Sequence, residues 1–260
     1  MKFLLPLGGK SLWGEEAKYM LRSLENYKDD IDLSIYSNEP VDWVKNCEVK
    51  IVPRYYPHNK DDKKFENFFD TLNKLRIFVD ENYTDGEFVY IYDDVLLLKE
   101  IDYIINYANN FIRPGDYRKM SKSRHGQTIL AARAKGNFVE YNYETHLPRR
   151  FSTFFLYDMF ERYPFDKLDI PYAPSTLYFN TYERDPIELA KTSNIKAGFY
   201  ADPEAGNGYL PKSREELNLS ITGKTWISYN DRGLLWRSGN NELLKEWIIE
   251  NFPNKSRWEK

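Results

Sequence analysis

The sequence predicts an α/β fold, a three-layer sandwich with a mainly parallel central sheet. Short apolar runs closed by glycine, proline or acidic residues are typical of buried strands. Longer segments with apolar residues three and four positions apart lie between these runs and are typical of helices. Strands that alternate with helices over the first hundred residues favour parallel pairing, with helices packed on the faces of the sheet.

Four short segments have the pattern of strands: residues 3–7, 32–37, 49–53 and 88–92. The first is closed by Gly8 and Gly9, a turn that leads into a helix. The last is the strongest strand candidate in the chain and ends abruptly at Asp93 and Asp94. Because ligands bind outside the carboxyl ends of strands in parallel sheets, both strand ends are candidate site positions.

Three segments have the apolar spacing of helices: residues 17–24, 64–81 and 242–251. The last of them is stopped by Phe252 and Pro253. Residues 137–182 are rich in aromatic residues and contain four prolines. For that segment we expect short elements and loops built around a pocket.

Composition excludes several classes of protein. A chain of 260 residues with 42% hydrophobic and 30% charged residues can bury a core, so it is neither a disordered nor a fibrous protein. The single cysteine, Cys47, excludes an internal disulfide framework and a multi-cysteine zinc site, and indicates a reducing compartment. No run approaches the roughly 18 apolar residues of a membrane span, so we expect a soluble, cytoplasmic protein.

The charge is unevenly distributed along the chain. The 37 basic and 40 acidic residues leave a net charge of −3, which argues against binding nucleic acid by bulk charge alone. Residues 113–135 nevertheless carry seven basic residues and one acidic residue, a local charge of +6, so the remainder sums to −9. Such a segment is either a solvated face or a place where a phosphate-rich ligand binds.

The adjacent carboxylates of Asp93 and Asp94 are the sharpest local feature. Two like charges at the end of a buried strand are costly to desolvate, and therefore call for a cation. Oxygen ligands of this kind suit Mg²⁺ or Mn²⁺, which binds one or two carboxylates and completes its shell with substrate phosphates. The alternative is that the two residues cap the next turn and face solvent.

Weaker signals accompany this one. Gly8, Gly9 and Lys10 after the first strand bring backbone N–H groups and a positive charge to a position where a phosphate or a nucleoside can bind. The segment matches neither the P-loop nor the dinucleotide fingerprint. His146 lies in a segment with the pattern of a loop, and Asn230-Asp231 follows another apolar run.

These pieces together resemble the Stealth family, nucleotide-sugar-dependent transferases that make capsular and related polysaccharides. The resemblance extends over short blocks that occur in the family's order: residues 7–13 with 16–24, 88–94, 146–148, and 227–231 with 252–259. Lys74 stands at the position of a family lysine on the helix before the second block. The resemblance implies a GT-A-like fold, with a nucleotide-sugar-binding half over 1–112 and an acceptor-side half over 113–260 of a single catalytic domain.

The resemblance also implies roles for particular residues. A divalent cation, Mn²⁺ or Mg²⁺, would be held by Asp93, Asp94 and Asp231 and would bridge the diphosphate of a UDP- or similarly activated sugar. The candidates for deprotonating the acceptor hydroxyl are Asp231, His146 and Glu144. The remaining expected contacts are with the donor, and they come from Gly8, Gly9, Lys10, Arg22, Lys74, Arg133 and Asn230.

Departures from the family pattern leave the reaction open. The opening motif of the sugar-phosphate-transferring members is replaced by residues 3–9, and the arginine that follows their histidine block is replaced around residues 177–180. Glycosyl transfer is therefore preferred over transfer of a sugar 1-phosphate. The acceptor is a cell-surface glycan or, in a phage-infected cell, a hydroxymethylated DNA base. Besides glycosyl transfer and sugar 1-phosphate transfer, the third interpretation is a non-catalytic carbohydrate-binding domain.

Overall fold

The structure is a computed structural model that describes residues 1–8, 14–56, 65–84, 86–111, 123–182, 195–202, 207–229 and 242–260. In its N-terminal part the elements in chain order are β1 (Lys2–Leu7), α1 (Glu15–Ser23), the 3-10 helix η2 (Leu24–Asn26), β2 (Asp32–Ser37), β3 (Glu48–Ile51), α2 (Glu66–Asn82), β4 (Glu87–Tyr90), β5 (Val95–Leu97) and β6 (Asn109–Phe111). The later elements are α4 (Arg124–Ala134), β7 (Tyr141–Asn142), β8 (Arg149–Ser152), α5 (Thr153–Arg162), α6 (Pro174–Thr181), β9 (Lys196–Asp202), β10 (Asn207–Tyr209), α8 (Arg214–Ile221), β11 (Trp226–Tyr229) and α9 (Glu242–Asn251).

The main sheet has five strands in the order β3-β2-β1-β4-β8. The pairs β3-β2, β2-β1 and β1-β4 are parallel, whereas β8 pairs antiparallel with β4 at one edge. The predicted α/β fold with a mainly parallel central sheet is therefore confirmed. Gly8 follows β1 and Asp93 follows β4. Because these neighbouring strands are parallel, both residues lie at the carboxyl-terminal end of the sheet.

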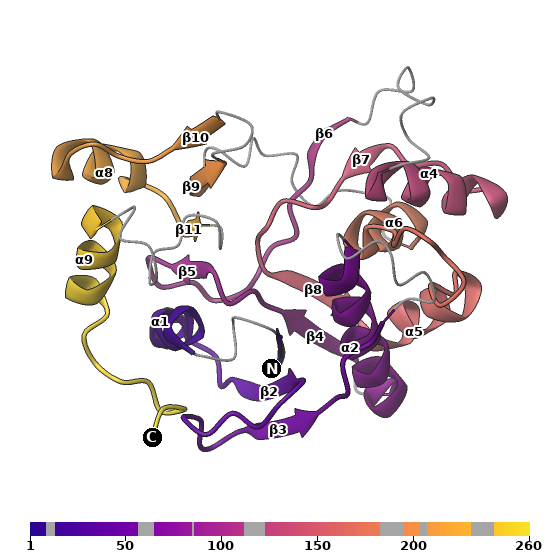
Figure 1. Cartoon of the computed structure of the whole chain (residues 1–260), viewed down its shortest axis with the longest axis horizontal. Coiled ribbons are helices and arrows are strands. Elements are labelled where there is room, and N and C mark those ends of the chain that lie inside the picture. Colours follow the sequence, from indigo (N-terminus) through magenta and orange to yellow (C-terminus); the bar gives the residue numbers. More distant parts are fainter. Residues whose placement is uncertain are drawn as a thin grey trace.

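Two hydrophobic cores cover the two faces of this sheet, as the alternation of side chains along β1 requires. Phe3, Leu5 and Leu7 pack into the core that contains α1 and α9, whereas Leu4 packs into the core that contains α2, α5 and α6. Figure 1 shows the same division, with α8 and α9 on the left and α4, α5 and α6 on the right. The fold is thus a sandwich with helices on both faces of the sheet.

A second sheet, of four strands in the order β10-β9-β11-β5, was not predicted. Its strand β5 begins immediately after Asp94 and pairs antiparallel with β11. The Tyr229 backbone N–H also donates to the Asp94 carbonyl oxygen over 3.1 Å. The second sheet therefore anchors the chain on the C-terminal side of the two aspartates.

The aromatic segment 137–182 is more regular than expected, because it contains the helices α5 and α6. Its aromatic rings mostly belong to the core: Phe151 stacks on Phe179 with ring centroids 5.4 Å apart and meets Tyr178 edge to face. Within the part of the chain that the structure describes, no helix is long and apolar enough to cross a membrane.

Candidate functional site

A pocket of about 480 Å³ opens at the carboxyl ends of β1 and β4. Among the residues that line it are Gly8, Asp93, Asp94, Glu144 and His146. We call it the carboxylate pocket. Six of the residues predicted from the sequence for catalysis, metal binding or donor binding, Lys74 among them, thus meet in one cavity, although they come from four separate parts of the chain.

Asp94 and His146 form the central pair of the carboxylate pocket. His146 Nε2 lies 2.7 Å from Asp94 Oδ1, and the His146 ring packs against Tyr92 with centroids 4.6 Å apart. The Asp94 side chain is 8% exposed and the His146 side chain 44%. The Asp94 carboxylate accepts this hydrogen bond, so we place the imidazole hydrogen on Nε2. Nδ1 of the neutral ring can then accept a proton.

Burial and charge act in opposite directions on His146. Burial by itself lowers the pKa of the imidazole, but the charge of Asp94 and the hydrogen bond to it raise the pKa more, so that it lies above its ordinary value. His146 also has a φ of 52°, in the left-handed region that non-glycine residues rarely adopt. The backbone around it must therefore be held in place by other groups.

Two cations, the fully buried Arg149 and the partly buried Lys196, hold the turn that carries His146. Arg149 is fully buried, and its guanidinium donates to the Tyr143 carbonyl, the Thr145 hydroxyl and, over 3.3 Å, the Pro148 carbonyl. Lys196 Nζ donates to the Thr145 carbonyl over 2.7 Å. Burial, followed by the charge of Arg149, lowers the pKa of Lys196 to about 8.

Lys74 belongs to a buried network beside Gly8. Its Nζ donates to the Leu7 carbonyl over 2.7 Å, to Asn38 Oδ1 over 2.9 Å and to Asp70 Oδ2 over 2.5 Å. The lysine side chain is 2% exposed, and burial lowers its pKa although Asp70 acts in the opposite direction. All three N–H donors are thus used to fix the end of β1.

The same network explains the glycine at position 8. A Cβ atom there would lie 2.8 Å from Asn38 Oδ1 and 3.1 Å from Lys74 Nζ, so a side chain would displace the network. Without one, the backbone at Gly8 lines the carboxylate pocket, where a ligand can approach it closely.

The carboxylate oxygens of this pocket are suitable ligands for a hard divalent cation. Asp93 and Asp94 both line the cavity, and a set of one or two carboxylates suits Mg²⁺ or Mn²⁺. The hydrogen bond from His146 to Asp94 is the kind of contact that orients a ligating carboxylate. A cluster of three or more metal-ligating side chains is absent from the described residues, and the third predicted ligand, Asp231, lies outside them.

Two of the predicted donor-binding residues lie elsewhere. Arg22 is near the C-terminal end of α1 and makes a bidentate pair with Glu259, with Nε–Oε1 and Nη2–Oε2 distances of 2.9 and 2.8 Å. Arg133 is exposed in the last turn of α4 and does not line the carboxylate pocket. Lys74 does line the carboxylate pocket, but its three hydrogen bonds hold the end of β1, so it acts through Gly8.

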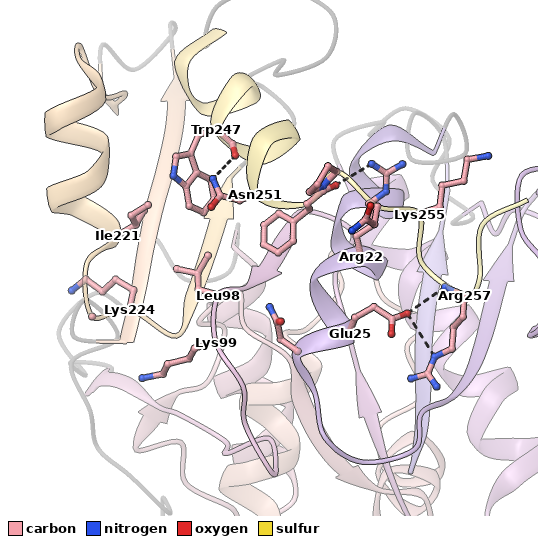
Figure 2. A pocket seen from close by; sticks show the side chains of 15 residues that line it. Arg22, Glu25, Leu98, Lys99, Ile221, Lys224, Trp247, Asn251, Lys255 and Arg257 are labelled. Carbon is pink, nitrogen blue, oxygen red and sulfur yellow. Dashed lines mark hydrogen bonds and ion pairs between the residues drawn. The ribbon is translucent and has the colours of Figure 1, made fainter.

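Arg22 lines a second, larger cavity, of about 900 Å³, that shares no lining residue with the first. We call it the lysine pocket, after Lys99, Lys224 and Lys255. Figure 2 shows these side chains around the cavity, together with Trp247 and Arg22. The structure thus does not bring Arg22 to the predicted site, because α1 points its C-terminal end toward this other cavity.

Several predicted positions lie outside the described residues. They are Gly9, Lys10, Asn230, Asp231 and, of the basic segment, residues 113–122.

Sequence reasoning missed the supporting residues. Asp70 stands four positions before Lys74 on a predicted helix, and this spacing could have indicated the ion pair. Arg149 and Lys196 gave no such signal, because nothing in their neighbourhood along the chain distinguishes a buried cation from a surface one. Asn38 follows a predicted strand, as Gly8 does.

No protein-family model and no curated protein sequence matches this chain. The resemblance to the Stealth family therefore remains one of short motifs.

Solved structures do match. The apo structure of WbbM, a bifunctional glycosyltransferase, superposes with a TM-score of 0.54 at 9% identity, over 98% of this chain and 50% of WbbM. The galactosyltransferase LgtC in complex with donor and acceptor sugar analogs gives a TM-score of 0.47 at 12% identity, over 98% and 96% of the two chains. An active-site mutant of LgtC gives 0.47 at 12% identity over 96% and 95%.

These similarities concern the fold. The chain spans about half the length of WbbM, with which it shares a mixed α/β architecture. The predicted mixed α/β fold with a mainly parallel central sheet is thus one that a solved structure shares.

Proposed function

We propose that this protein transfers a sugar from a nucleotide-sugar donor to an acceptor hydroxyl. The observation that carries the proposal is the carboxylate pocket, where Gly8, Asp93, Asp94 and His146 meet at the carboxyl ends of two parallel strands. The WbbM-like fold supports it, since WbbM is described as a glycosyltransferase.

The donor would bind against Gly8 and the two aspartates. The backbone at Gly8 lines the pocket, where a nucleotide could contact it, and the network of Lys74, Asp70 and Asn38 keeps that backbone in place. Asp93 and Asp94 would hold Mn²⁺ or Mg²⁺, and a bound cation neutralises charge on a diphosphate leaving group. Lys10, Asn230 and Asp231 remain candidates for further contacts with the donor or cation.

His146 is the candidate base for the acceptor hydroxyl. Its Nε2–H is held by Asp94, so its Nδ1 can take a proton from the acceptor hydroxyl. The turn that presents it is fixed by Arg149 and Lys196. Glu144 also lines the pocket and is the alternative base in the described part of the chain.

The pocket draws on both expected halves of a single catalytic domain. Gly8 and the aspartates come from residues 1–112, whereas Glu144 and His146 come from residues 113–260. The donor side and acceptor side of the reaction would accordingly correspond to these halves. We place the reaction in the cytoplasm, where nucleotide sugars and reduced cysteines such as Cys47 occur together.

The reaction can be tested with a panel of nucleotide sugars in the presence of Mn²⁺. Release of UDP or another nucleoside diphosphate is expected and indicates glycosyl transfer. Release of UMP would instead indicate the alternative, transfer of a sugar 1-phosphate. The assay thereby separates the two reactions by the bond that breaks.

A thermal-shift measurement distinguishes the enzyme from a carbohydrate-binding domain. An enzyme of this kind is stabilised by a nucleotide together with Mn²⁺, because both bind the folded state. A sugar-binding domain gains stability from glycans alone. Stabilisation by glycans without any effect of nucleotide would contradict the proposal.

A further inference from the structure

Three side chains on the wall of the carboxylate pocket form a group of their own: Phe68, Arg124 and Glu144. They come from the first turn of α2, the first residue of α4, and the segment between β7 and β8. The guanidinium carbon of Arg124 lies 3.9 Å from the centroid of the Phe68 ring, and Phe68 is 40% exposed. The guanidinium therefore covers part of one face of an exposed aromatic ring in the cavity.

Arg124 and Glu144 have hydrogen-bonding capacity that the protein leaves unused. Arg124 Nη2 and Glu144 Oε2 are 3.8 Å apart, too far for a hydrogen bond. Arg124 Nε and Glu144 Oε1 are buried and have no hydrogen-bond partner within the described ranges. Those two atoms are closed to a ligand, but the 3.8 Å gap between Nη2 and Oε2 leaves room for a group that both donates and accepts.

A sugar hydroxyl does both. Its oxygen accepts from the guanidinium and its hydrogen is donated to the carboxylate, and an oxygen about 2.8 Å from each group spans the gap between them. About a fifth of each side chain, 20% of Arg124 and 19% of Glu144, is accessible to such a ligand. The part of the Phe68 ring that Arg124 leaves exposed offers an apolar surface for the C–H groups of a sugar.

Charge distinguishes a sugar from a nucleic acid here. One arginine and one glutamate give a neutral pair, which suits a neutral polyol. A phosphate would meet the Glu144 carboxylate as well as Arg124, and like charges in a partly buried site repel. The described part of the pocket wall therefore favours a glycan over a DNA strand.

We propose that Phe68, Arg124 and Glu144 form the acceptor subsite of the carboxylate pocket and bind a neutral sugar ring through a hydroxyl group. The assignment to the acceptor rests on the proposed function, in which the donor occupies the Gly8 side. Phe68 is six residues before Lys74 on α2, about 9 Å along the helix axis. The subsite thus lies farther along the pocket than the network behind Gly8.

Direct binding tests this subsite. A panel of methyl glycosides is titrated into the wild type and into Phe68→Ala, Arg124→Gln and Glu144→Gln, with binding followed by saturation-transfer NMR. We expect Kd to rise at least about tenfold in Phe68→Ala and Arg124→Gln, which lose the stacking surface and a charged hydrogen bond. Glu144→Gln keeps an acceptor oxygen and should have the smaller effect.

Phe155→Ala is the matched control. Phe155 is 41% exposed, like Phe68, but stacks on Tyr182 and does not line the pocket. Its glycoside binding should equal that of the wild type. Circular dichroism of every variant checks that the fold is retained.

Turnover then separates acceptor from donor. With the nucleotide sugar that the wild type uses, the KM for the acceptor should rise about tenfold in Arg124→Gln while the KM for the donor changes less than about twofold. An equal rise in both values overturns the acceptor assignment. Glycoside binding that is the same in all variants overturns the subsite but leaves the proposed reaction intact.

Two further outcomes are informative. If the wild type releases no nucleotide from any donor, yet glycoside binding depends on Phe68 and Arg124, the proposed reaction fails while a sugar site remains. An oligonucleotide containing 5-hydroxymethylcytosine provides the rival probe. If it binds through Arg124 and no glycoside does, the neutral-sugar proposal is overturned.

Discussion

The lysine pocket is larger than the carboxylate pocket, yet it has the weaker claim to be the active site. The lysine pocket, at about 900 Å³, contains basic side chains that already have partners: Arg22 is paired with Glu259, and Arg257 Nε lies 3.7 Å from Glu25. The carboxylate pocket has about half that volume and holds adjacent aspartates, a histidine and a loosely paired arginine. The chemistry of the side chains that line a cavity thus indicates a functional site better than the volume of the cavity does.

The two pockets also differ in their position relative to the secondary structure. The carboxylate pocket lies at the carboxyl ends of β1 and β4, where ligands of parallel sheets bind. The lysine pocket lies where α1, α8 and α9 end, and lysines near helix C-termini are favourable without any ligand. Positive charge at the second cavity therefore has a structural reason of its own.

The largest expected effect comes from removing the paired carboxylates. Asp93→Ala combined with Asp94→Ala should lower nucleotide-sugar turnover at least about a hundredfold, because it removes the cation ligands and the partner of His146. Nucleotide release with Mn²⁺ is the measurement, and circular dichroism checks the fold. Glu25→Gln, which changes a carboxylate of the lysine pocket, is the matched control and should retain activity. Full activity of the double variant would contradict the proposed reaction.

Arg22 and Lys74 provide the next comparison, since each is a cation paired with a buried carboxylate. Arg22→Ala and Lys74→Met should each lower the free energy of unfolding by about 3 kcal/mol, because each leaves a buried carboxylate unpaired. Urea unfolding measures both. At temperatures where both are folded, only Lys74→Met should impair turnover, since only Lys74 supports Gly8. Equal turnover in the two variants would remove the distinction between the pockets.

The pair of Arg22 and Glu259 should also be sensitive to pH. Burial raises the pKa of Glu259, but the hydrogen bonds from Arg22 and Ser256 lower it more, so the carboxyl pKa is below its ordinary value of 4.5. A lowered folded-state pKa stabilises the protein above about pH 4.5, and this stability is lost as the pH falls through the folded-state pKa. The excess stability of wild type over Glu259→Gln should therefore shrink below that pH in urea titrations. A constant difference down to about pH 3 would show that the pair does not titrate in this way.

The smallest expected effect is at Lys99. This lysine is exposed at the lysine pocket, so Lys99→Glu should alter turnover less than about twofold and stability by less than about 0.5 kcal/mol. Turnover and thermal unfolding measure the two effects. A large loss of turnover would show that the lysine pocket takes part in the reaction.

Much of the fold followed from local patterns in the sequence. The strand predicted over 32–37 has those bounds, and the helix predicted over 64–81 is found at Glu66–Asn82. The edge strand β8 was not predicted, because Arg149–Ser152 alternates little in hydropathy and is set by pairing with distant β4. Non-local pairing of this kind leaves little trace in a short segment.

The sequence predicted the candidate reactive side chains of the carboxylate pocket but not the residues that hold them in place. Asp93 and Asp94 are recognisable as adjacent carboxylates, and the family resemblance led to His146. Arg149 shows no such pattern, since its role depends on carbonyl groups that only the folded turn brings to it. Arg22 lies at the lysine pocket and not at the carboxylate pocket, and the sequence could not show this, because a basic residue on a helix does not indicate which end of the sheet it faces.

The position of the nucleotide tests the central claim most directly. Mn²⁺ is paramagnetic and broadens the NMR signals of nearby nuclei, so UDP and Mn²⁺ added to labelled protein reveal where the complex forms. We expect broadening at Gly8, Thr71 and His146, which line the carboxylate pocket, and none at Gly223 and Asn254, which line the lysine pocket. Broadening at the lysine pocket with none at the carboxylate pocket would contradict the claim that the carboxylate pocket is the active site.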